Sequence, residues 1–150
     1  MKEALFKRTF EISLHENEKD GIRAEVQMSD VLHDMTITLD VSLPDFLISN
    51  TTLKVDKAPG ENCEELSSRM AELNGRQVKH GFTQLVQDLY GQADGCPNLV
   101  NMLLSSVPLA INASWMIAMK HGVPYEQIKR VQESQMKDIC ISFRSGGEKR

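Results

Sequence analysis

The chain has 150 residues, of which 41% are hydrophobic and 25% are charged, a composition typical of a globular domain rather than a disordered or fibrous chain. Its 17 Lys and Arg residues against 21 Asp and Glu residues give a formal net charge of −4, which disfavours nucleic acid as a partner. We find no signal peptide, and polar residues interrupt the most apolar stretch, residues 99–118, so no membrane span is expected. These features predict a cytoplasmic protein, in which three cysteines are not expected to form disulfides.

The first third of the chain has the two-residue periodicity of half-buried strands. Apolar and polar residues alternate most strictly from Met35 to Leu43, and Asp20-Gly21 is a strong turn signal between two earlier alternating runs. We predict strands over residues 6–14, 22–28, 35–43 and 48–55. Because short turns connect them, the strands should form an antiparallel meander.

After residue 60 the apolar spacing changes to three and four residues, which indicates helices. Asn62 is a candidate N-cap for a first helix that ends before Asn74-Gly75, and Pro108 is expected to kink a long apolar helix. The predicted helices cover residues 63–73, 82–89, 99–119 and 125–139. Strands followed by helices predict a single α+β domain over residues 1–140, with a helical layer on one sheet face and a flexible tail over residues 141–150.

Three element starts carry residues capable of chemistry. They are the segments Leu32-His33-Asp34-Met35, Asn62-Cys63-Glu64 and Gly95-Cys96-Pro97-Asn98-Leu99. Unsatisfied N–H groups in the first turn of a helix favour a thiolate over a thiol, and thiolate is the form that binds metals. If the helix starts point at the start of the third strand, Cys63 and Cys96 would converge on His33 and Asp34.

Ordinary structural roles compete with this interpretation. Free cysteines are often packing residues, and Cys140 near the predicted tail is given no role. His33 and Asp34 are equally suited to hydrogen bonds with nearby backbone. The sequence has no phosphate-binding glycine loop, no metalloprotease motif and no nucleophile elbow, so no catalytic residue is assigned and a binding protein is favoured over an enzyme.

Between about Phe10 and Trp115 the sequence resembles an uncharacterised bacterial family, known as a domain of unknown function. The Leu-His-Asp-Met run at residues 32–35 and the Gly-Cys-x-x-Leu run at residues 95–99 carry the resemblance. Asn98 stands where members of that family usually have His.

The order of chemical residues is also distantly similar to that of NifU/IscU-type iron–sulfur scaffold proteins. The similarity aligns Asp34, Cys63 and Cys96 with three ligand positions of those scaffolds, whereas Leu32 stands at the first scaffold cysteine and Gly95 at the scaffold histidine. It implies a scaffold-like fold and a site for zinc or iron, including an iron–sulfur cluster.

Three functional hypotheses follow from these patterns. The first is a metal-binding or scaffold-like protein whose ligands are His33, Asp34, Cys63 and Cys96. The second is a metal-free module of the same fold that binds a small apolar ligand or a protein partner, including a second copy of the chain. The third makes Cys96 a nucleophile or sulfur carrier with His33 as its base.

Overall fold

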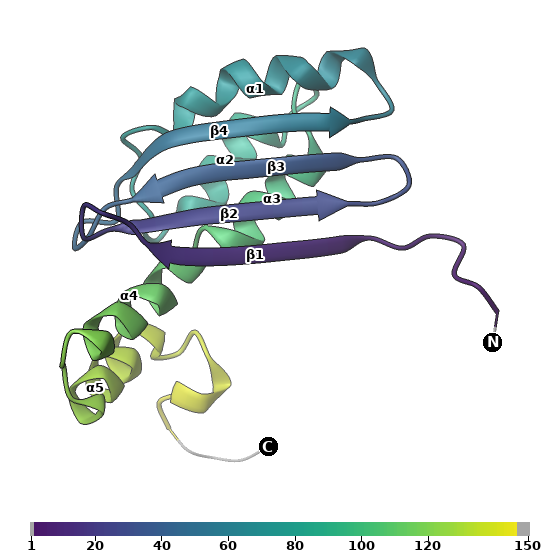
Figure 1. The fold of residues 1–150 in the computed structure, drawn as a ribbon. Helices are drawn as coiled ribbons and strands as arrows, with labels where there is room; N and C mark the ends of the chain where they lie inside the picture. Colours follow the sequence, from purple (N-terminus) through teal and green to yellow (C-terminus); the bar gives the residue numbers. More distant parts are fainter. Residues whose placement is uncertain (1, 147–150) are drawn as a thin grey trace. The chain divides into compact units, whose positions relative to one another are not determined.

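Four antiparallel strands form the sheet of the protein, whose structure is a computed structural model that describes residues 2–146 (Figure 1). The strands are β1 (Thr9–Glu16), β2 (Ile22–Ser29), β3 (Asp34–Val41) and β4 (Ile48–Lys57). Their order in the sheet is β1-β2-β3-β4, so each strand pairs with its neighbour in sequence. The predicted α+β fold with an antiparallel meander is confirmed.

One face of the sheet carries the core. In β3, Ile37 pairs with Val26 of β2 on one side and with Leu53 of β4 on the other, and all three are buried. Because successive strand residues point to opposite faces, the alternating sequence of β2 and β3 buries every second residue against the helices. Figure 1 shows α2 and α3 behind this sheet.

The predicted helix over residues 63–73 forms as three short pieces. They are η1 (Glu61–Glu64), α1 (Glu65–Arg69) and η2 (Met70–Leu73). Gly60 precedes the first turn and no side chain caps it, so the expected N-cap role of Asn62 is wrong. The hydroxyl of Ser68 donates to the carbonyl of Glu65, a local bond of the kind that competes with regular helix.

The remaining helices follow the prediction closely. They are α2 (Phe82–Tyr90), α3 (Pro97–Ser106), α4 (Leu109–Lys120) and α5 (Tyr125–Met136), followed by η3 (Ile141–Phe143). The long predicted helix is interrupted between α3 and α4 at Pro108, which has no N–H to donate. Among residues 2–146, the helical segment 97–120 is long and apolar enough to cross a membrane by length and composition alone, and 33% of its most apolar 18-residue window is buried.

Residue contacts group the chain into two units, residues 1–113 and residues 114–150. In the second unit, Trp115 Nε1 donates to Gln135 Oε1 at 2.9 Å, and Ile128 is buried. Ser145 donates to the Asp138 carboxylate there. The single domain over residues 1–140 and the flexible tail stay predictions, and residues 147–150 of that tail lie outside the described residues.

Candidate functional site

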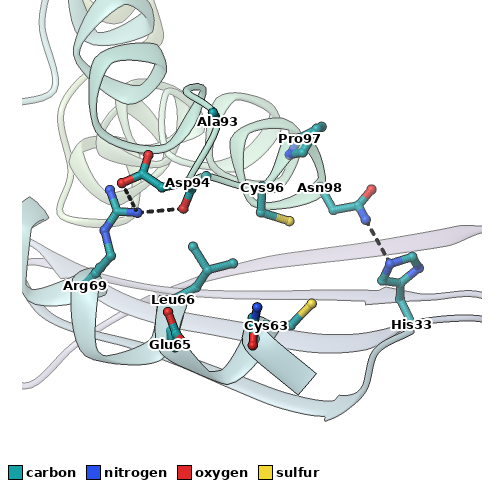
Figure 2. Close-up of a pocket in the computed structure, with 12 residues that line it drawn as sticks. His33, Cys63, Glu65, Leu66, Arg69, Ala93, Asp94, Cys96, Pro97 and Asn98 are labelled. Carbon is teal, nitrogen blue, oxygen red and sulfur yellow. Dashed lines mark hydrogen bonds and ion pairs between the residues drawn. The ribbon is translucent and has the colours of Figure 1, made fainter. Parts of the chain in front are cut away.

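A pocket of about 580 Å³ opens between the start of the first helical segment and the start of α3 (Figure 2). One wall comes from η1 and α1, the other from the loop that leads into α3, and His33 lies at one end. The lining residues are His33, Asn62, Cys63, Glu65, Leu66, Arg69, Ala93, Asp94, Gly95, Cys96, Pro97 and Asn98. The pocket therefore contains three of the four side chains that the sequence singled out.

Cys63 and Cys96 lie on opposite walls of this pocket. Cys63 belongs to η1, and Cys96 directly precedes α3, which begins with Pro97. Both are partly exposed free thiols, and in Figure 2 both sulfur atoms point toward the end of the pocket that holds His33. The predicted convergence of two helix starts thus brings both thiols to one cavity.

The loop before Cys96 is fixed by close backbone contacts. The N–H of Cys96 donates to the Tyr90 carbonyl at 2.9 Å, and a Cβ added to Gly95 would lie only 1.9 Å from that carbonyl oxygen. Arg69 of α1 stabilises the same loop, because its guanidinium donates to the carbonyl oxygen of Asp94 in the loop and to that of Leu89 near the end of α2. The position of Cys96 therefore depends on a glycine immediately before it.

His33 is positioned by the turn between β2 and β3. The carboxylate of Asp30 accepts the backbone N–H groups of Leu32 and His33 at 2.7 and 2.8 Å. The same oxygen lies 3.1 Å from Nδ1 of the His33 ring. This turn thus orients the imidazole as well as the backbone.

A second set of contacts joins His33 to α3 and to the segment before β1. Nδ2 of Asn98 lies 3.2 Å from His33 Nε2, and Oδ1 of Asn98 accepts a hydrogen bond from Arg8 Nη1 at 2.8 Å. Arg8 also donates from Nε to Asp30 Oδ2 at 2.7 Å. The four side chains form a closed ring of polar contacts, which we call the Arg8–Asp30–His33–Asn98 ring.

Asp30 is the buried charge in this ring, with a side chain that is 0% exposed. Burial raises the pKa of the Asp30 carboxyl, but hydrogen bonds from Leu32, Arg8 and His33 outweigh burial and hold the pKa well below its ordinary value of 3.8. Asp30 is therefore a carboxylate at neutral pH. It can accept hydrogen bonds but cannot donate one.

Asp34, the fourth predicted ligand, does not line the pocket. Its carboxylate accepts a hydrogen bond from Gln27, an exposed residue on the sheet face opposite the core. Met35, the next residue, is buried on the core face. The structure thus places Asp34 on the outer face, because neighbouring residues of a strand point in opposite directions.

The three remaining candidates are not arranged as a ready metal site. Within residues 2–146, no three side chains of His, Cys, Asp or Glu lie close enough together to hold a metal ion. His33, Cys63 and Cys96 share the pocket, but the ring nitrogen Nε2 of His33 already contacts Asn98. Metal binding would require these side chains to move.

Sequence reasoning missed the residues that support His33. Asp30 had a local signal, because an Asp three residues before another polar residue at a strand-to-strand turn is typical of side-chain-to-backbone turns. Arg8 had none, because its hydrogen bond to Asn98 joins positions 90 apart in the chain, and Asn98 had one only through the family resemblance, in which His usually stands at that position.

Comparison with known proteins gives a family but no described function. Residues 9–112 match the family described as "Protein of unknown function (DUF2889)". No curated protein and no solved structure matches the chain.

Proposed function

Since the chain belongs to the DUF2889 family of unknown function, we propose a function from the pocket itself: it binds a single zinc or iron ion through Cys63, Cys96 and His33. One observation carries the proposal, namely that two thiols and an imidazole from three separate chain segments line the same cavity. Thiolate and imidazole are the ligands that zinc and iron prefer in proteins. Asp34 is left out because it lies on the other face of the sheet.

The contact between Asp30 and His33 supports this proposal. Metal-binding histidines commonly donate their second ring N–H to a carboxylate, which fixes the orientation of the ring. Asp30 lies 3.1 Å from Nδ1 of His33, so Nε2 is the ring nitrogen that a metal ion would take in place of its present contact with Asn98. A bound ion would act there as a structural element or a Lewis acid.

A likeness to NifU/IscU-type scaffolds is a more specific claim than metal binding, and it stays a prediction. The helix-start positions of Cys63 and Cys96 support it. Leu32, at the position of the first scaffold cysteine, is 49% exposed and does not line the pocket. A single ion with three protein ligands is therefore favoured over a cluster, which usually takes four.

Titration with cobalt(II), a spectroscopic substitute for zinc, tests the proposal. Thiolate-to-cobalt absorption should appear in the reduced protein, and competition with zinc should remove it. Cys63→Ser and Cys96→Ser should each weaken zinc binding at least about tenfold, because loss of a residue that merely supports a ligand already costs that much. Cys140→Ser is the matched control, because Cys140 lies outside the pocket, and it should bind as the unchanged protein does.

Absence of thiolate-to-cobalt absorption in the unchanged protein would contradict the proposal. Equal weakening of zinc binding in all three serine variants would also contradict it, because Cys140 does not line the pocket.

A metal-free binding module is the second candidate, favoured by the separation of the donor groups. A volume of about 580 Å³ suits a small organic molecule better than a bare ion. Asn62, Glu65 and Asn98 make much of the lining polar, so the ligand would carry polar groups rather than be wholly apolar. This candidate predicts that a Cys63→Ser, Cys96→Ser double variant folds normally and that zinc leaves the melting temperature unchanged.

A further inference from the structure

The directions of the hydrogen bonds in the Arg8–Asp30–His33–Asn98 ring can be assigned from chemistry alone. An arginine side chain only donates, so Asn98 must turn its oxygen toward Arg8 and its NH2 group toward His33. Nε2 of His33 must then be the acceptor, which leaves the ring hydrogen on Nδ1. That hydrogen faces Asp30, which as a carboxylate only accepts.

The two ends of the ring together select one neutral form of His33: Asp30 requires a hydrogen on Nδ1, and the NH2 group of Asn98 requires a free lone pair on Nε2. Arg8 enforces the second requirement by holding the Asn98 oxygen. Within this form, the only lone pair of the ring in the plane of the imidazole is on Nε2, and Asn98 uses it. A metal ion coordinates that same lone pair, so the ion and the Asn98 amide exclude each other.

From this arrangement we propose that Asn98 is a displaceable occupant of His33 Nε2, which keeps His33 from a ligand in the pocket until that ligand displaces the amide. The identity of the ligand as a metal ion rests on the proposed function above. Asn98 would then be a positioning residue that lowers affinity, not a ligand. Asn98 lies in the first turn of α3, two residues after Cys96. Displacement of its amide would therefore take place beside the pocket wall that carries the Cys96 thiol.

Removal of the occupant should strengthen binding. A typical hydrogen bond contributes about 0.5–1.5 kcal/mol, so Asn98→Ala should tighten zinc binding about two- to tenfold. If Asn98 instead served to hold His33 in place for the metal, the same variant would weaken binding. The sign of the change therefore separates a competing residue from a supporting one.

The experiment combines zinc affinity with nitrogen NMR of the metal-free protein. Protein labelled with ¹⁵N-histidine reports which ring nitrogen carries the hydrogen, and a His33→Gln variant identifies the His33 signals. Asn101→Ala is the matched control, since Asn101 is exposed on the same helix. We expect hydrogen on Nδ1 of His33, a shift of the Nε2 signal in Asn98→Ala but not in Asn101→Ala, and tighter zinc binding in Asn98→Ala only.

Three results would overturn this inference: hydrogen on Nε2 in the unchanged metal-free protein, an Nε2 signal that does not respond to Asn98→Ala, or weaker zinc binding in that variant. If the unchanged protein binds no zinc, the proposed function fails separately. The NMR signals of the metal-free protein then decide alone whether Asn98 occupies Nε2.

Discussion

Arg8 and Asn98 are joined by a hydrogen bond of 2.8 Å although 90 positions separate them in the chain. The same guanidinium pairs with the buried carboxylate of Asp30, so one side chain connects the segment before β1, the β2–β3 turn and α3. The planar guanidinium contacts both partners at once because its N–H groups point in different, fixed directions. Arg8 is therefore a structural link at one end of the pocket.

Arg8→Lys should break this link, because a single ammonium group cannot replace the two directed contacts. In a double-mutant cycle with Asn98→Ala, the two changes should be coupled by at least about 0.5 kcal/mol in the free energy of unfolding. Urea denaturation of the four proteins measures the coupling. Strict additivity would mean that the contact between Arg8 and Asn98 adds nothing to stability.

Gly95→Ala should destabilise the protein by about 1–3 kcal/mol, because the new Cβ would overlap the Tyr90 carbonyl and neither backbone segment can move freely. The change should also displace Cys96 and slow or speed its alkylation relative to Cys63. Gly60→Ala is the control, since a Cβ there would meet nothing within 4 Å. Thermal unfolding and mass-spectrometric alkylation rates check both effects, and equal stability of the two variants would refute the close contact.

Asp34→Asn should leave zinc affinity within about twofold, whereas His33→Gln should weaken it at least about tenfold. These neighbours differ because His33 lines the pocket and Asp34 interacts with Gln27 on the outer face. Competition with a chromophoric chelator measures both affinities. Comparable losses in the two variants would return Asp34 to the ligand set.

Asp30 should contribute to acid sensitivity. The pKa of the Asp30 carboxyl is lowered in the folded protein, so below about pH 3.8 the unfolded chain binds a proton that the folded chain does not. The free energy of unfolding therefore decreases as the pH is lowered through this range. Above that pH the contribution is fully present. Asp30→Asn should be less stable than the unchanged protein at pH 7, and the difference should shrink as the pH falls toward 2.

Chemical denaturation between pH 2 and pH 7 follows this difference. Two stability curves that stay parallel over the whole range would show that the ionisation of Asp30 is not coupled to folding.

The sheet was predictable because its signal is local. In β3 the alternation of Met35, Thr36 and Ile37 reports directly which residues face the helices. The helix over residues 63–73 was predicted less well, since the apolar spacing at Leu66, Met70 and Leu73 is also met by three short turns. Apolar periodicity reports which face is buried but not how continuous the hydrogen bonds are.

Part of the candidate site was likewise predictable from the sequence, and part of it was not. That Cys63 and Cys96 would meet followed from their places at helix starts, and the structure brings both to one pocket. Treating His33 and Asp34 as a pair ignored the two-residue period of the strand that begins there. The contacts of Arg8 could not be predicted, because they depend on which distant segments the finished sheet brings together.

The family match begins at residue 9, one position after Arg8. A recombinant fragment trimmed to residues 9–112 would keep all four strands and α3 but lose the guanidinium that neutralises Asp30. A buried carboxylate without its cation is destabilising, so such a fragment should have a lower free energy of unfolding. It would also lack the hydrogen bond from Arg8 that orients the Asn98 amide. A stable fragment of this protein should therefore begin upstream of the family boundary.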